Sequence, residues 1–194
     1  KPFVEKLPSY IRDTKYILSI LADLKWETGM LLVTLDVVSL YTNIMHELAI
    51  TALRYYLHTR AAEYLEHTNM LLEMSALILE NNVFLFNDIW YRQLRGVAMG
   101  SRFAPSLANL FMGWFEVRHV WSPIAGHLTQ YILYWGRFID DIILIWTGGE
   151  VKLLEFIDYL NTNLYGMQFT VKYDTSNIQF LDVELKVEGD SICS

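Results

Sequence analysis

Cysteine is almost absent from this chain of 194 residues, which has one copy, Cys193, next to its C-terminus. A single cysteine can form neither an internal disulfide nor a cysteine-based metal site, so both are excluded as sources of stability. The lack of disulfides fits an intracellular, reducing compartment.

Long apolar runs are also missing, although 53% of the residues are hydrophobic. Asp23, Asp36 and Asp140 are among the charges that interrupt apolar segments before any reaches the ~20 residues of a membrane-spanning helix. No signal peptide, internal repeat, low-complexity tract or Gly/Ser linker is visible. The sequence therefore predicts one domain with a sizeable core and no membrane partner.

Basic residues are too few for a simple nucleic-acid-binding module. The chain has 15 Lys and Arg against 22 Asp and Glu, a net charge of −7. Such modules usually present a basic face, so this balance counts against one.

The apolar pattern predicts strands and helices in alternation. A continuous apolar run over residues 30–38, holding one aspartate, is typical of a buried strand. Helices, the first capped by Asp13 or Thr14, are expected at 14–24, 47–58, 63–80, 106–120 and 150–164. Hairpins are expected at 83–92 and 131–146, with a closing strand pair formed by 168–173 and 178–187. This order predicts an α+β fold, an antiparallel sheet with helices packed on one face.

Two adjacent carboxylates, Asp140 and Asp141, separate the apolar runs 131–139 and 142–146. Aspartate is common in turns, which is the ordinary explanation for such a pair. Here the neighbours are almost wholly apolar, and packed like charges repel unless a cation joins them. Because carboxylate oxygens are preferred ligands of Mg²⁺, the pair indicates a metal site.

Asp36, at the end of the run 30–38, is the candidate third acid. A helix N-cap would also explain it, but the next strong helical pattern begins near His46, too far away. Together with Asp140 and Asp141 it would complete the minimal set for two metals about 3.5–4 Å apart. One Mg²⁺ would activate an attacking 3′-oxygen and the other would stabilise a pyrophosphate leaving group, with Mn²⁺ as a substitute.

A glycine-containing loop over 96–105 precedes the helix expected at 106–120. Glycines before a helix N-terminus let the backbone approach a phosphorylated or planar ligand. Many loop-to-helix junctions look like this one, so its value lies in its position between the two acidic motifs.

In this order, the motifs resemble a reverse transcriptase of the Penelope-like retroelement type, a relative of telomerase. The matching segments are 35–44 (LDVVSLYTNI), 98–101 (AMGS), 104–105 (AP), 108–112 (ANLFM), 138–141 (FIDD) and 180–183 (FLDV). They correspond to motifs A, B and C and the region near motif E, and they extend over nearly the whole chain. The resemblance implies that residues 1–194 are a right-hand polymerase palm with part of the fingers. Most of the fingers and the thumb are expected outside this fragment, which alone is expected to be inactive.

The resemblance also implies roles for single residues. Asp36, Asp140 and Asp141 would be the catalytic acids, with a metal also bound by the backbone carbonyl of Val37. Tyr41, five residues after Asp36, would be the steric gate that leaves no room for a ribose 2′-hydroxyl.

The remaining implied contacts are with the nucleotide and the primer. The nucleotide-binding residues would be Tyr41, Met99, Gly100, Ala104 and Pro105, and the primer end would be seated by Phe180 and Leu181. Met99 stands where many reverse transcriptases have glutamine, and Phe138 stands where tyrosine is usual. For the general acid the sequence offers only Lys172, which a solvent-facing strand lysine explains at least as well.

The function implied is RNA-directed DNA synthesis by a nuclear retroelement enzyme acting on an RNA template, a DNA primer and dNTPs. A decayed or domesticated copy, kept as a non-catalytic RNA-binding scaffold, is the main alternative. The retained acids argue against it, since a scaffold has no need to concentrate carboxylates. A palm-like nucleotide cyclase is a third reading, but it leaves the loop at 99–105 unexplained.

Overall fold

The computed structural model describes residues 3–60, 62–98 and 100–194. Its longer helices are α1 (Thr14–Ala22), α3 (His46–Arg60), α4 (Thr68–Glu80), α5 (Ala104–Phe115) and α7 (Gly149–Asn161). The shorter helical segments are η1 (Val4–Lys6), α2 (Leu40–Asn43), η2 (Ala62–His67), η3 (Glu116–Val120), η4 (Pro123–Ala125) and α6 (Gly126–Thr129). The strands are β1 (Leu31–Val37), β2 (Val83–Phe86), β3 (Ile89–Arg92), β4 (Ile132–Phe138), β5 (Asp141–Trp146), β6 (Phe169–Asp174), β7 (Asn177–Phe180), β8 (Val183–Glu188) and β9 (Ser191–Cys193).

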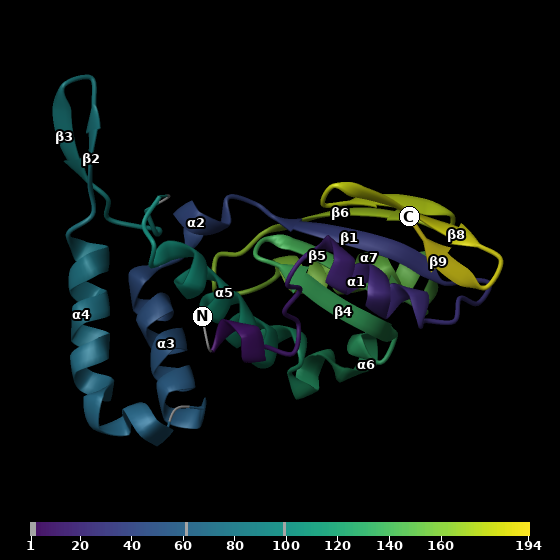
Figure 1. Ribbon diagram of the computed structural model, residues 1–194, viewed down its shortest axis with the longest axis horizontal. Coiled ribbons are helices and arrows are strands. Elements are labelled where there is room, and N and C mark those ends of the chain that lie inside the picture. The colour runs from purple at the N-terminus through teal and green to yellow at the C-terminus, as the bar shows by residue number, and fades with distance from the viewer. Residues whose placement is uncertain (1–2, 61, 99) are drawn as a thin grey trace.

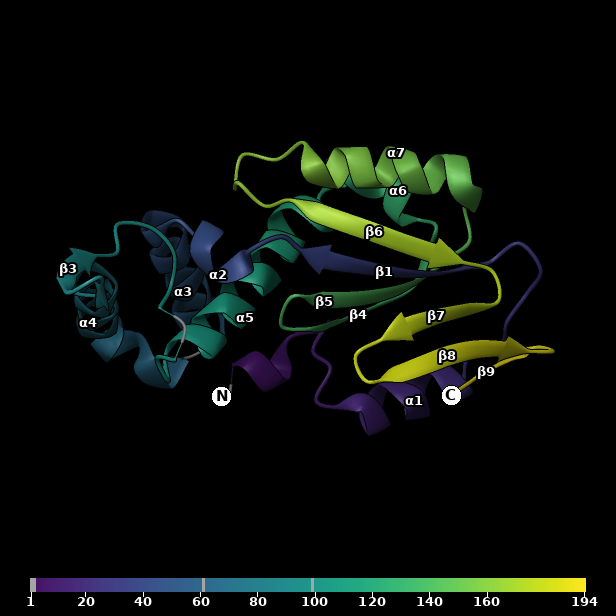
Figure 2. The ribbon, with the colours of Figure 1, turned by 90° about the horizontal axis from the view of Figure 1, so that it is seen from above.

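A four-stranded antiparallel sheet in the order β4-β5-β1-β6 forms the centre of the fold. Its strand β1 is apolar on both faces, since the neighbours Leu32 and Val33 are both fully buried. Side chains alternate along a strand, so each face of the sheet needs its own cover. Helices α5 and α7 cover one face, and α1 with the small sheet β7-β8-β9 covers the other (Figures 1 and 2). The predicted α+β class is confirmed. The prediction that helices pack on one face of the sheet is wrong, because α1 packs on the face opposite α5 and α7.

The predicted pairing of 168–173 with 178–187 is also wrong. Strand β6 pairs with β1 at the edge of the central sheet. The segment 178–187 divides at Leu181, whose φ is +51°, into β7 and β8, which form a separate sheet with β9. The division follows from burial, because Ile178 and Phe180 pack with the core on the face opposite α5 and α7.

The expected helices are present, with differences at their ends. Of the two predicted N-cap residues, Asp13 and Thr14, it is Asp13 that caps α1, by accepting a hydrogen bond of 2.8 Å from the Tyr16 amide. The helix expected at 63–80 is divided into η2 and α4, and the one expected at 106–120 begins at Ala104 and ends in a π-helical turn at 116–120. The sequence pattern missed the single-turn helix α2, which follows Ser39 in a left-handed conformation (φ +50°).

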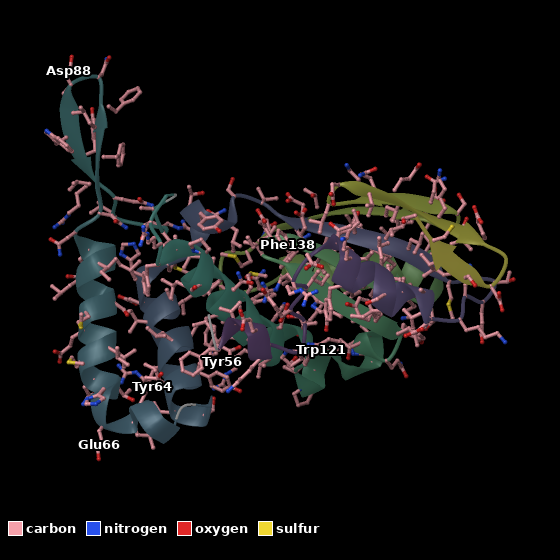
Figure 3. The ribbon with its side chains drawn as sticks, in the orientation of Figure 1. Tyr56, Tyr64, Glu66, Asp88, Trp121 and Phe138 are labelled. Carbon is pink, nitrogen blue, oxygen red and sulfur yellow. The ribbon has the colours of Figure 1, made fainter. Side chains whose placement is uncertain are left out.

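The hairpin of β2 and β3 is confirmed and stands away from the rest of the fold, above α4 (Figure 1). Asn87 and Asp88 turn it with φ values of +54° and +60°, as a type I′ turn requires. Asp88 marks its tip, while Phe138 lies in the body of the molecule (Figure 3). All eight strand residues are exposed, and Phe86 and Trp90 keep 65% and 69% of their surface uncovered.

Across the described residues, no helix combines the length and apolar character needed to cross a lipid bilayer.

Candidate carboxylate site

Two of the predicted acids face each other across neighbouring strands. Asp36 on β1 is paired with Asp141 on β5 in antiparallel register. Directly opposite residues share a face of the sheet. The alternation that buries Val33 and Leu35 against α5 and α7 therefore directs Asp36 to the opposite face, with Asp141 beside it. Like charges in this relation repel, so the pairing has an electrostatic cost.

A groove of about 230 Å³ opens at this pair. It is lined by Thr34, Leu35, Asp36, Asp141, Thr170, Lys172, Gln179, Phe180 and Leu181. Phe180 and Leu181 come from the end of β7, so the structure brings the two predicted primer-binding residues to the same groove as two predicted acids. Lys172, the candidate general acid, is exposed and also lines it.

The third acid, Asp140, lies in the turn between β4 and β5. Phe138 and Asp141 are the last paired residues, which leaves Ile139 and Asp140 as the turn. The Asp140 carbonyl accepts a hydrogen bond of 3.2 Å from the Val37 amide. The turn is thereby attached to the end of β1, next to Asp36.

The charges of the three acids affect the pKa values of Asp140 and Asp141. Burial raises the pKa of Asp140, and the nearby charge of Asp36 raises it further, while Arg137 lowers it. Burial likewise raises the pKa of Asp141, with added contributions from Asp140 and Asp36. Each of these shifts means that the ionised carboxylate is penalised in the folded protein.

These raised pKa values predict that Asp140 and Asp141 destabilise the metal-free protein increasingly as pH rises. A carboxyl whose folded-state pKa exceeds its unfolded value, about 3.9 for aspartate, contributes stability that is fully present below the unfolded pKa. That contribution is lost as pH rises through the folded pKa. We expect the double variant Asp140→Asn/Asp141→Asn to gain melting temperature over the parent progressively as pH rises above about 4, the unfolded-state pKa of aspartate. Circular dichroism melts in EDTA measure it, and a gap that stays constant or shrinks with pH would contradict the expectation.

The donor atoms suit a hard divalent cation, since burial and mutual repulsion would both be relieved by positive charge among carboxylate oxygens. Nevertheless, within residues 3–60, 62–98 and 100–194 no three His, Cys, Asp or Glu side chains form a group that could hold a metal ion as they stand. The assignment of Asp36, Val37, Asp140 and Asp141 as metal ligands therefore stays a prediction.

Tyr41, the predicted steric gate, lies in α2 close to the acids. Burial and then the charge of Asp140 raise the pKa of its hydroxyl. Its backbone carbonyl accepts a hydrogen bond of 2.6 Å from the Val97 amide, and the Gly96 amide donates to the Ile44 carbonyl at 2.9 Å. The glycine-containing loop is therefore fastened to the residues that follow β1.

The other predicted nucleotide-binding residues are spread along this loop and the start of α5. Gly100 is exposed with a φ of +93°, and Ala104 is fully buried. Pro105 lines a second hollow of about 240 Å³ together with Phe138 and Ile139, so it does reach the β4–β5 turn. Met99 lies outside the described residues.

Sequence reasoning missed a buried polar network beneath the turn. Arg137, Glu116 and Asn109 are at most 6% exposed, and Arg137 donates hydrogen bonds to both Glu116 and Asn109. Two signals were available. Arg137 interrupts the otherwise apolar strand before Phe138, and Glu116 follows a strongly apolar helix.

No protein-family model and no curated protein sequence matches the chain. Solved structures match it in fold. Telomerase from Candida albicans, in complex with a TWJ fragment of telomeric RNA, aligns with a TM-score of 0.73 and 13% identity over 99% of this chain and 36% of that one. Apo telomerase from Candida tropicalis, truncated from its C-terminal domain, aligns with a TM-score of 0.70 and 11% identity over 99% of this chain and 43% of that one. An RNA polymerase complex inside a dsRNA virus aligns less well, with a TM-score of 0.56 and 13% identity over 82% of this chain and 16% of that one.

The chain thus shares its fold with telomerase, an enzyme related to reverse transcriptases, and spans less than half the length of those telomerase chains.

Proposed function

We propose that this chain is the catalytic palm of an RNA-directed DNA polymerase from a nuclear, Penelope-like retroelement. It would add dNTPs to the 3′-end of a DNA primer along an RNA template. The observation that carries the proposal is the cross-strand pair Asp36–Asp141 with Asp140 in the adjoining turn, on a fold shared with telomerase.

The residues around the pair fit this chemistry. Two Mg²⁺ ions held by Asp36, Asp140 and Asp141 would supply charge at the attacking and leaving oxygens. The carboxylates lie at the end of paired strands, so their positions are set before substrate binds, which lowers the reorganisation needed. Phe180 and Leu181 offer an apolar wall in the same groove on which the terminal nucleotide of the primer would rest.

Tyr41 would select deoxynucleotides, and its substitution tests that role. We expect Tyr41→Ala to raise incorporation of ribonucleotides relative to deoxynucleotides by roughly 10–100-fold, because the ring no longer fills the space of a 2′-hydroxyl. Tyr41→Phe is the matched control, since it keeps the ring and should keep the selectivity. The ratio of kcat/KM for the two nucleotides measures it. An unchanged ratio in Tyr41→Ala would remove Tyr41 from this role.

Primer extension on an RNA template, with Mg²⁺ and dNTPs and the protein at its full natural length, tests the function itself. Template-directed incorporation supports the proposal, and its absence from a folded protein contradicts it. Calorimetric titration with Mn²⁺ and a dNTP separates an enzyme from a non-catalytic RNA-binding scaffold, which would bind RNA without binding this pair of ligands.

A further inference from the structure

Arg137 is a fully buried guanidinium on β4, one residue before Phe138. Its Nε donates to Glu116 Oε1 at 2.7 Å, and Glu116 is 3% exposed. A buried ion pair contributes little net stability, because desolvating both charges offsets their attraction. The other hydrogen bonds of Arg137 therefore offer the better explanation of why it is there.

Those bonds reach the turn that carries Asp140. Arg137 Nη1 donates to the Ile139 carbonyl at 3.0 Å and to Asn109 Oδ1 at 3.1 Å, while Nη2 donates to the Asn109 carbonyl at 3.3 Å. The guanidinium is a rigid planar fork, so these acceptors are held in one fixed relation. One side chain thus fixes both the β4–β5 turn and helix α5.

The turn needs such a support. Ile139 has a φ of +58°, a conformation that a β-branched residue adopts only where its surroundings impose it. Two hydrogen bonds hold the turn in this conformation. Arg137 holds the Ile139 carbonyl from one side, and the Val37 amide holds the Asp140 carbonyl from the other.

Asn109 extends the connection to the start of α5. Its Nδ2 donates to the Pro105 carbonyl at 2.9 Å, while its Oδ1 accepts from Arg137. Pro105 belongs to the predicted nucleotide-binding set, and it lines the hollow beside Ile139. A chain of side-chain hydrogen bonds therefore joins the turn with the acids to the helix start where the nucleotide is predicted to bind.

We propose that Arg137 is a positioning residue, which imposes the strained turn at Ile139 and thereby sets where Asp140 lies relative to the start of α5. Its relevance to nucleotide transfer rests on the proposed function. The claim about the turn stands on this network alone and is tested without substrate.

Hydrogen exchange in the metal-free protein provides that test. The test uses the double variant Glu116→Gln/Arg137→Met. The unbranched methionine keeps most of the volume of Arg137, and the Glu116→Gln change avoids leaving a buried carboxylate without its partner. The Val37 amide reports on the turn because its acceptor is the Asp140 carbonyl, and the Leu144 amide in the buried centre of β5 is the reference. We expect Val37 to exchange at least about tenfold faster than in the parent, with Leu144 changed by less than about threefold.

Two further variants keep the test decisive. Ser9→Ala is the matched control, because it removes another hydrogen bond to Glu116, of 2.6 Å, without touching the guanidinium, and should leave Val37 exchange unchanged. Arg137→Lys serves if the double variant does not fold. An ammonium can pair with Glu116 but cannot also hold Ile139 and Asn109, so Val37 exchange should again accelerate.

The proposal is overturned if a folded Arg137→Lys or double variant retains the parent's Val37 exchange. Kinetics of the full-length protein add a separate arm. A displaced Asp140 should lower kcat by about 10–100-fold while the KM for dNTP stays within about threefold. An inactive parent protein would count against the proposed function alone, whereas accelerated exchange at Val37 would still support the positioning role.

Discussion

Replacing Asp140 by asparagine is expected to reduce nucleotide incorporation roughly a thousandfold and to raise the melting temperature of the metal-free protein. Both effects follow from removing the negative charge of the Asp140 carboxylate. Burial and the charge of Asp36 penalise the ionised carboxylate, so a neutral side chain of the same shape removes that penalty. The same neutral side chain is a poor partner for a divalent cation. Primer extension and thermal melting in EDTA measure the two effects.

A second aspartate supplies the control for this pair of effects. Asp88→Asn alters an exposed residue at the hairpin tip, whose positive φ asparagine tolerates equally well. It should leave both melting temperature and incorporation near those of the parent. If Asp140→Asn retained activity within about tenfold of the parent, Asp140 would not be a catalytic metal ligand. A fall in its melting temperature would contradict the electrostatic explanation.

Replacing Gly96 by alanine is expected to cost roughly 2–4 kcal/mol of the free energy of unfolding. A Cβ there would lie 2.6 Å from the Tyr41 carbonyl oxygen and 2.7 Å from the Thr42 Cα, and both are backbone atoms that cannot rotate away. The φ of +84° adds backbone strain for any L-residue. Chemical denaturation followed by circular dichroism measures the loss.

Gly149→Ala separates the two contributions. Gly149 also has a positive φ, +69°, but an added Cβ would meet nothing within 4 Å. Its substitution should therefore cost only the backbone term, about 1 kcal/mol. Equal losses in the two variants would show that close packing of the loop on α2 is not what Gly96 provides.

The central hairpin and its acids could be predicted because local and global signals agree there. The apolar runs on either side of Asp140 and Asp141 fit only paired strands, and β4 and β5 have bounds close to those expected. Asp36 lies near the end of an apolar run, and a run that is apolar on both faces predicts a strand inside a sheet, as β1 is. Its partner strand could not be read from the run itself, because strand order depends on contacts between distant segments.

The errors came from features that single-segment patterns do not record. The short separation between 168–173 and 178–187 favours pairing of these two segments, but in the structure β6 pairs with β1 at the edge of the central sheet. The network around Arg137 was missed since its members lie 21 and 28 residues apart along the chain. The left-handed Ser39 and Ile139 could not be anticipated either, as neither residue type favours that conformation.

The exposed hairpin of β2 and β3 affects how the protein associates with itself in solution. Large apolar surface on both sides of a two-stranded ribbon, with unpaired strand edges, favours self-association that grows with concentration. A molecule that binds this ribbon only in the folded form would raise the apparent stability of the protein by mass action. Melting temperatures of this chain should therefore be compared at matched protein concentration.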